Sequence, residues 1–164
     1  MWDKESFRRA FIVYFDKFTQ TVATDAGDWV IKGFIDVYQN VYTISVDTKV
    51  ISKLVELMLI PIISQFAKRY DYEVVLAKYQ NYYPDITLIA PDDTLIAIDL
   101  KSTYRASSKS VSGFTLGAFT GYFRDRSSTK NIMFPYGEYA AHFVLGIIYT
   151  RTEAEIEEQI TYTL

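Results

Sequence analysis

Two short apolar runs separated by a turn are the feature that most constrains how this chain can fold. Residues 86–89 and 95–98 are rich in β-branched side chains, and the sequence between them contains Pro91, Asp92, Asp93 and Thr94. Apolar runs of this length joined by Pro and Asp are typical of a β-hairpin. The sequence therefore predicts two antiparallel strands that meet at this turn.

The ends of the predicted hairpin carry three charged side chains. If the turn is centred on Asp92, Asp85 lies opposite Asp99 and both carboxylates project from the same face. Side chains in a strand alternate with a period of two, so Lys101 shares the face of Asp99, whereas Leu100 points away. We expect the two aspartates and the lysine to form one cluster.

This cluster suits a divalent cation. Two opposed carboxylates roughly 5 Å apart repel each other by about 4 kcal/mol at an effective dielectric constant of about 20. Mg²⁺ removes that penalty and leaves coordination positions for phosphate oxygens. A neighbouring lysine can orient an attacking water or stabilise developing charge. The alternative is a surface hairpin with an isolated ion pair, and spacing alone leaves the two open.

The motif Pro84-Asp85, followed by Asp99-Leu100-Lys101, resembles the PD-(D/E)XK nuclease signature. The flanking stretches are more specific: they are VDTKV (46–50), PII (61–63), NYYPD (81–85), IAID (96–99), FTLG (114–117), TKNI (129–132) and IYTR (148–151). In order and spacing, residues 46–151 resemble the EcoRV family of type II restriction endonucleases.

The resemblance implies a role for individual side chains. Asp85 and Asp99 match metal-binding carboxylates, Lys101 matches a catalytic lysine, and Glu56 matches an acid that reaches the site from a helix and assists a metal ion or its water. The positions with implied DNA contacts are Lys49, Lys78, Gln80, Asn81, Thr103, Thr115 and Lys130.

The chain departs from the family pattern in two places. Tyr79 and Tyr82 stand where the minor-groove loop of the family has a glutamine and a histidine, which puts the sequence preference in doubt. The family's major-groove reading loop lies beyond the segment that matches Arg151, and thirteen residues follow Arg151 here. We therefore expect either a catalytic core cut from a longer protein or a naturally short relative.

Composition is consistent with a single domain. The 164 residues are 49% hydrophobic and contain no Cys, which excludes disulfides and thiolate metal sites. The charged first ten residues do not form a signal peptide, and we expect no apolar run of membrane-spanning length and a cytoplasmic protein. We divide the chain into a dimerisation segment (1–45), a catalytic core (46–151) and an acidic tail (152–164).

The net charge of −3 conceals a local basic segment. Residues 101–130 contain six basic residues and one acidic residue, which gives a local charge of +5. Phosphate contacts come from Lys and Arg, so this segment is a candidate DNA-facing surface. A solvated face is the other interpretation, and we favour it for the acidic tail.

Hydrophobic periodicity predicts an α/β (α+β) fold with a mixed sheet flanked by helices, as in restriction endonucleases. The expected helices cover residues 4–18, 47–69 with Asp47 as cap and Pro61 as a kink or break, and 116–124. The expected strands cover residues 73–76, 84–90, 94–103, 131–134 and 140–151, with a hairpin over 29–45 and a mobile Ser-rich loop over 106–112. Glu56 could also be an ordinary exposed helix residue, and we expect His142 to be a packed side chain rather than a base.

The sequence lacks a Gly-rich phosphate loop, a nucleophile motif and a His cluster. The best interpretation of the residues is Mg²⁺-dependent hydrolysis of DNA phosphodiester bonds. The resemblance implies, more narrowly, a type II restriction endonuclease that acts as a homodimer on a palindrome in double-stranded DNA, with a cognate DNA methyltransferase in the same host. A repair or junction nuclease of the same signature and a non-catalytic DNA-binding or assembly fragment remain open.

Overall fold

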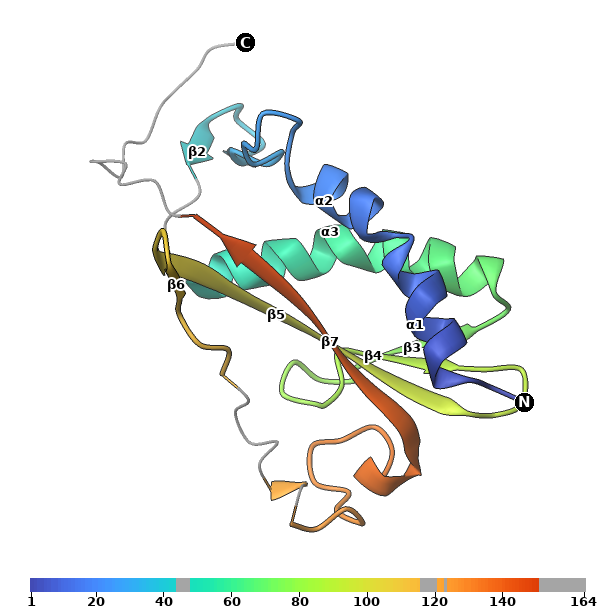
Figure 1. Cartoon of the computed structure of the whole chain (residues 1–164). Helices are drawn as coiled ribbons and strands as arrows, with labels where there is room; N and C mark the ends of the chain where they lie inside the picture. Colours follow the sequence, from blue (N-terminus) through green and yellow to red (C-terminus); the bar gives the residue numbers. More distant parts are fainter. Residues whose placement is uncertain (44–47, 116–120, 123, 151–164) are drawn as a thin grey trace.

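A mixed five-stranded sheet with helices on one face forms the body of the computed structural model, which describes residues 1–43, 48–115, 121–122 and 124–150 (Figure 1). The helices are α1 (Lys4–Ile12), α2 (Phe15–Val22) and α3 (Thr48–Arg69). The strands are β1 (Gly33–Ile35), β2 (Val41–Thr43), β3 (Glu73–Leu76), β4 (Ile86–Ile89), β5 (Leu95–Ser107), β6 (Ser110–Val111) and β7 (Tyr139–Tyr149), and a short 3-10 helix (Tyr136–Glu138) precedes β7. The predicted fold class is confirmed.

The central hairpin has the predicted register. In the antiparallel pair of β4 and β5, Ile86 lies opposite Ile98 and Thr87 opposite Ala97. This register continues by one step to Asp85 and Asp99, just beyond the last paired residues. The turn residue Asp93 has φ 63°, a left-handed conformation that Asp tolerates better than most residues.

The sheet extends to both sides of this hairpin. β3 pairs with β4 in antiparallel fashion, β7 runs parallel to β5, and β6 folds back on the end of β5. The parallel pairing aligns Asp99 with Val144 and Lys101 with Gly146. Strand β7 therefore forms the neighbour of the strand that carries the predicted catalytic residues.

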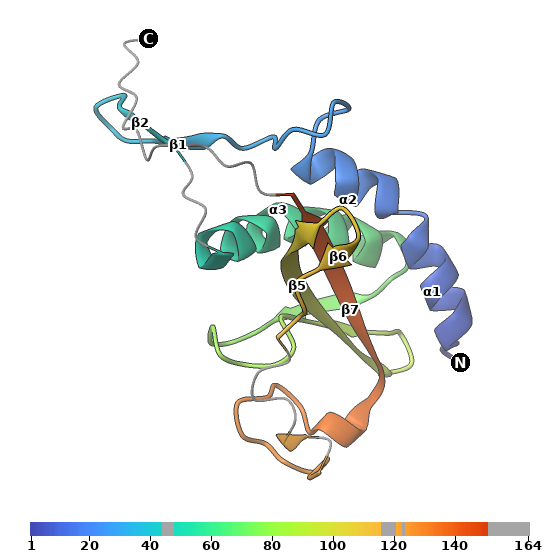
Figure 2. The ribbon, with the colours of Figure 1, turned by 60° about the vertical axis from the view of Figure 1, so that its left-hand side comes forward.

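The three helices lie together against one face of the sheet, whereas the segment after β6 runs along the other side (Figures 1 and 2). Val55, Leu59, Ile63 and Phe66 of α3 are buried and contribute to the main hydrophobic core. Phe66 has ring contacts with several aromatic side chains, which are Phe7, Phe11, Tyr14, Tyr70 and Tyr72. The aromatic-rich first helices thus cover α3.

One helix prediction is wrong, and the break that Pro61 could have produced in another helix is absent. The helix expected over residues 4–18 is divided at Val13 and Tyr14, and the division lets both Phe11 and Phe18 reach the core. The helix α3 passes through Pro61 without a break, because Pro61 lies on its exposed face while the flanking turns are held by buried side chains. Asp47, the expected cap, is outside the described residues.

Two further segments differ from the predicted secondary structure. The Ser-rich stretch 106–112 continues β5 and returns as β6, and the Ser107 and Ser110 hydroxyl oxygens lie 2.7 Å apart across the turn. The strand expected over 131–134 is reduced to one parallel bridge between Tyr83 and Ile132, since Asn131 adopts a left-handed φ of 54°. The helix expected over 116–124 falls largely outside the described residues.

The amino-terminal hairpin is confirmed as the short pair β1–β2. Asp36 closes its turn by accepting hydrogen bonds from the backbone N–H groups of Tyr38 and Asn40, both at 2.9 Å. Ile35, Val37 and Tyr38 are 61%, 89% and 82% exposed. This hairpin stands away from the five-stranded sheet (Figure 2), and it presents these apolar side chains to solvent.

Helix α3 corrects the expectation that no segment approaches the length of a membrane span. Residues Lys49–Arg69 are long and apolar enough to cross a membrane by length and composition, with a mean hydropathy of 1.7. The core helix of a globular protein meets the same criterion, and the contacts of Leu59, Ile63 and Phe66 place α3 in the core of this molecule.

Candidate active site

Asp85 immediately precedes β4, and Asp99 lies beside it on the neighbouring strand β5. Asp99 is 3% exposed, and its carboxylate forms an ion pair with Lys101. The carboxylate of Asp85 accepts a hydrogen bond of 2.6 Å from the backbone N–H of Leu100. The hairpin register and the strand period thus bring the three predicted side chains together.

Both carboxyl groups are held in surroundings that disfavour two negative charges. Burial, followed by the repulsion from Asp99, raises the pKa of Asp85 to about 6. Burial also raises the pKa of Asp99, although the hydrogen bond and the charge of Lys101 oppose this effect. In the absence of a cation, the pair therefore retains a proton to a higher pH than exposed carboxyl groups do.

Glu56 approaches this cluster without joining it. Its side chain on α3 is 27% exposed and forms an ion pair of 2.6 Å with Lys53, while its negative charge contributes to the raised pKa of Asp85. Within the described residues, no group of three or more His, Cys, Asp or Glu side chains is close enough to hold a metal ion. The role of Glu56 as a metal ligand stays a prediction.

The predicted DNA-contacting side chains are divided between the surface and the interior. Those that the structure exposes are Lys49, Lys78, Gln80, Asn81, Thr115 and Lys130. Thr103 is 5% exposed, and its hydroxyl donates a hydrogen bond of 2.8 Å to the carbonyl oxygen of Ser112. A direct DNA contact by Thr103 stays a prediction that its burial disfavours.

A polar pair that supports the position of Asp85 was not predicted. The Tyr83 hydroxyl lies 2.7 Å from Nδ1 of His142, and the ring of Tyr136 stacks on the imidazole with centroids 3.9 Å apart. Burial is the main cause of the lowered pKa of His142. His142 is therefore a packed side chain, as expected. Its position beside Tyr83, the residue before Pro84-Asp85, depends on the fold and could not be predicted from the sequence.

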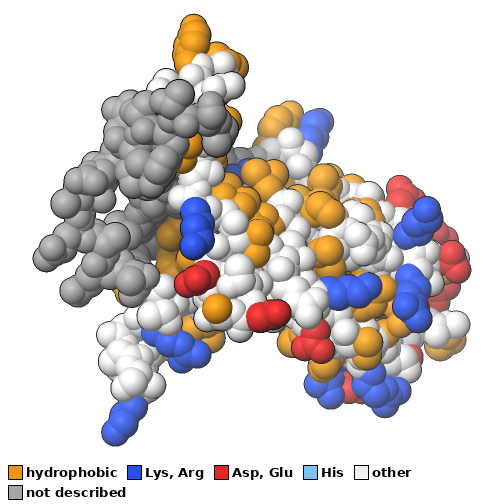
Figure 3. Space-filling model, turned by 90° about the horizontal axis from the view of Figure 1, so that it is seen from above, with side chains coloured by type: hydrophobic (Ala, Val, Ile, Leu, Met, Phe, Trp, Pro, Cys, Tyr) orange, Lys and Arg blue, Asp and Glu red, His pale blue; other side chains and the backbone are white. Residues whose placement is uncertain are grey.

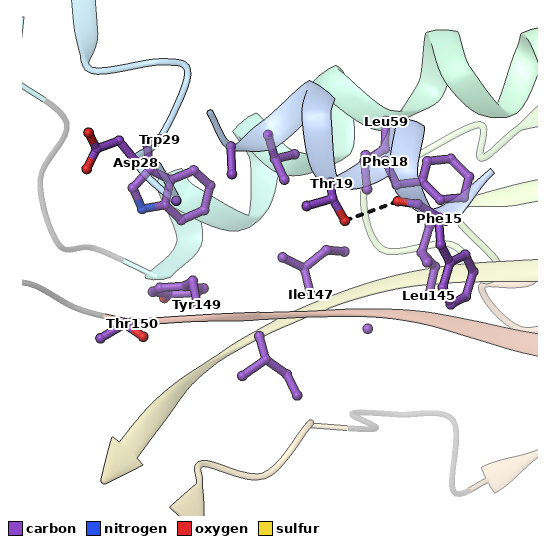
Figure 4. Close-up of a pocket in the computed structure, with 15 residues that line it drawn as sticks. Phe15, Phe18, Thr19, Asp28, Trp29, Leu59, Leu145, Ile147, Tyr149 and Thr150 are labelled. Atoms are coloured by element: carbon purple, nitrogen blue, oxygen red, sulfur yellow. Dashed lines mark hydrogen bonds between the residues drawn. The ribbon is translucent and has the colours of Figure 1, made fainter. Parts of the chain in front are cut away.

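The described residues also enclose a cavity of about 480 Å³ away from the acid pair. It lies between α2, the loop that follows it and the end of β7, with Trp29 above Tyr149 and Thr19 bonded to Phe15 (Figure 4). Asp85, Asp99 and Lys101 do not line this cavity. The candidate site is instead on the opposite face of the sheet.

The mixed sheet with helices on one face, and two acids and a lysine at its central hairpin, defines a restriction-endonuclease-like fold. Comparison with protein families matches residues 25–164 to the family described as Restriction endonuclease EcoRV. The chain is also 39% identical over 134 residues to the Type II restriction enzyme EcoRV of Escherichia coli. The chain therefore belongs to the EcoRV restriction endonuclease family.

The match covers 80% of this chain and 54% of the E. coli enzyme. The chain thus spans about half the length of the curated relative it matches.

Proposed function

We propose that this chain carries the catalytic core of a type II restriction endonuclease that hydrolyses phosphodiester bonds of double-stranded DNA in a palindromic site. The observation that carries the proposal is the adjacent pair of Asp85 and the buried Asp99, with Lys101 bonded to Asp99. Membership of the EcoRV family supports it. A protein of this kind acts on DNA in the cytoplasm beside a cognate DNA methyltransferase.

The donor set fits Mg²⁺. Burial raises the pKa of both adjacent carboxyl groups, and repulsion from Asp99 raises that of Asp85 further, so the pair gains most from a hard divalent cation with oxygen ligands. Asp85 and Asp99 would hold the ion, with Glu56 supplying further negative charge from α3. Bound Mg²⁺ would supply Lewis-acid stabilisation of the charge that develops on the phosphate.

The chain's own residues account for the rest of the chemistry. The ammonium of Lys101 is held by Asp99, so it is positioned to hold the attacking water and to face the negative charge of the phosphorane-like transition state. The hydrogen bond from Leu100 N–H fixes the rotamer of Asp85. The exposed side chains Gln80, Asn81 and Lys130 are available for contacts with DNA.

Incubation with supercoiled plasmid and Mg²⁺ tests the proposal. Cleavage that requires Mg²⁺ is expected, with discrete fragments only where the polypeptide tested also reads its site, whereas selective cutting of branched DNA would support a repair or junction nuclease. Asp85→Ala, Asp99→Ala and Lys101→Ala should each lower the cleavage rate by at least about a hundredfold. Full-rate cleavage by Lys101→Ala, or no cleavage by the unchanged chain, would contradict the assignment.

A homodimer completes the proposed function, because one active site cuts one strand and a palindrome presents two equivalent strands. The exposed apolar side chains of the β1–β2 hairpin support dimerisation through residues 1–45.

A further inference from the structure

Gly146 of β7 leaves space that an aromatic ring from a distant segment occupies. A Cβ atom at this position would lie 2.8 Å from Cζ of Phe114 and 3.4 and 3.5 Å from its two Cε atoms. Carbon atoms do not approach to 2.8 Å without displacement. Glycine at position 146 is therefore the condition for the observed position of the Phe114 ring.

The ring lies over the face of the sheet that carries the candidate active site. Gly146 pairs with Lys101, and Val144 pairs with Asp99. Paired residues of neighbouring strands direct their side chains to the same face. Because the Cβ direction of Gly146 points at Phe114, the ring stands on the face of Asp99 and Lys101.

Hydrogen bonds attach the same segment to β5. The backbone N–H of Ser112 donates to the carbonyl oxygen of Tyr104 at 2.9 Å. The buried Thr103 hydroxyl lies 2.8 Å from the Ser112 carbonyl oxygen and 3.4 Å from that of Gly113. Residues 112–114 are thus fixed at one end by β5 and at the other by the contact between Phe114 and Gly146.

Phe114 contributes little to the stability of the core. Its side chain is 39% exposed and lies outside the two buried hydrophobic clusters. An aromatic side chain that is ordered at the surface loses conformational freedom, and limited burial returns little of that cost. The contact does, however, determine the position of the next residue, Thr115, which is exposed.

We propose that Phe114 is a positioning residue, whose ring on Gly146 holds residues 112–115 over the catalytic face so that this segment meets the DNA backbone beside Lys101. The inference rests on the proposed function and adds to it a segment, residues 112–115, that positions the DNA backbone. It assigns Thr103 an anchoring role in place of a direct contact.

Paired substitutions at the two positions test this inference. Gly146→Ala adds the methyl group that displaces the ring, whereas Phe114→Leu removes the Cζ and Cε atoms that the methyl group would meet. Ala at 146 should therefore be harmful in the wild-type background and harmless in the Phe114→Leu background. Gly137→Ala is the matched control, because a Cβ there would meet its nearest neighbours at 3.5 Å, an ordinary contact.

Two measurements are made on the full chain. Hydrogen exchange of residues 112–115 should become faster in Gly146→Ala, and it should be no faster in the double variant than in Phe114→Leu. Binding of a duplex in the presence of Ca²⁺ should weaken about tenfold in Gly146→Ala, equivalent to one charge-assisted hydrogen bond to phosphate. Phe114→Leu, which removes the ring, should weaken binding as well, and the double variant should bind no more weakly than Phe114→Leu.

Unchanged exchange and binding in Gly146→Ala would overturn the inference, as would a double variant that binds more weakly than Phe114→Leu. Faster exchange with unchanged DNA affinity would also overturn it, since the segment would then be anchored without placing DNA. If the unchanged chain neither binds nor cuts duplex DNA, the proposed function fails, and hydrogen exchange alone still decides whether Phe114 anchors the segment.

Discussion

As long as no cation is bound, the surroundings of Asp85 favour its protonated form more strongly than water does. Its pKa is raised from 3.8 to about 6, mainly by burial and then by Asp99. A carboxyl group whose folded-state pKa exceeds its unfolded value gives stability that is complete below the unfolded pKa and is lost as pH rises through the folded pKa. Metal-free protein should therefore lose about 2–3 kcal/mol from this group between about pH 4 and pH 7.

Asp85→Asn should remove this loss while keeping an oxygen that can accept from Leu100 N–H. Urea denaturation in EDTA should show the variant to be more stable than the wild type at pH 8 and no more stable at pH 4. His142, whose pKa is lowered by burial, changes the stability in the opposite sense near pH 6 in both proteins, so the difference between them isolates Asp85. Equal stability at pH 8 would contradict the prediction.

At the level of single residues, spacing predicted what depends on strand geometry. Asp85, Asp99 and Lys101 could be grouped because a period of two and one turn position determine which side chains share a face. The pairing of Phe114 with Gly146 could not be predicted, since it depends on where β7 lies beside β5 and on the path of the chain after β6. The same holds for the contact between Tyr83 and His142.

Helix α3 retains a proline in its interior, and this element supplies a prediction about stability. Pro61 has no N–H to donate to the preceding turn, and its side chain is exposed, so its replacement sacrifices no core packing. Pro61→Ala should raise the free energy of unfolding by about 1–3 kcal/mol, as helix propensities indicate. The measurement is denaturant unfolding at pH 7.

Ser64→Ala is a suitable control for that measurement, because this substitution does not restore a missing backbone N–H to the helix. The Ser64 hydroxyl already donates a hydrogen bond to the carbonyl oxygen of Ile60. A Pro61→Ala protein that is less stable than wild type would show that the proline maintains a curvature on which the packing of α3 depends.

The elements that were predicted incorrectly share a physical cause. The helix expected over residues 4–18 has a continuous apolar pattern, but Tyr14 packs edge-on against Phe66, and the chain divides there to bring Phe11 and Phe18 into the core. The Ser-rich stretch pairs as strands because its hydroxyl groups satisfy each other in the turn. In neither case did the apolar pattern reveal the side-chain contact, whereas that pattern alone was sufficient for β3 and the β4–β5 hairpin.

The whole molecule presents apolar surface that a partner copy would cover. Figure 3 shows hydrophobic side chains reaching the surface of the face seen from above, and Ile35, Val37 and Tyr38 of the β1–β2 hairpin are among the most exposed. If the chain forms the proposed dimer through this hairpin, Ile35→Lys with Tyr38→Lys should convert it into monomers in sedimentation experiments, because charged ammonium groups are costly in an apolar interface.

Leu76→Lys on β3 is the control for that experiment, since Leu76 is also exposed but belongs to the five-stranded sheet and not to the hairpin. A wild-type chain that sediments as a monomer at high concentration would contradict dimerisation through this hairpin. Equal dissociation by the control variant would show that added charge, rather than the position of the hairpin, weakens association.

Sequence preference is a property of the whole DNA interface, and the 164-residue chain spans 54% of the E. coli relative. Among the described residues, the side chains exposed near the site include Gln80, Asn81, Thr115 and Lys130, which suit minor-groove and phosphate contacts. Base-edge contacts in the major groove each contribute about 1–3 kcal/mol of discrimination, whereas phosphate contacts contribute none. We therefore expect the 164-residue chain to bind DNA weakly, with strong salt dependence and nearly without sequence preference. Titration of labelled duplexes with and without a palindrome, in Ca²⁺ at two salt concentrations, measures the affinity and the sequence preference. A preference above about tenfold would mean that residues 79–82 or another element of this chain read bases.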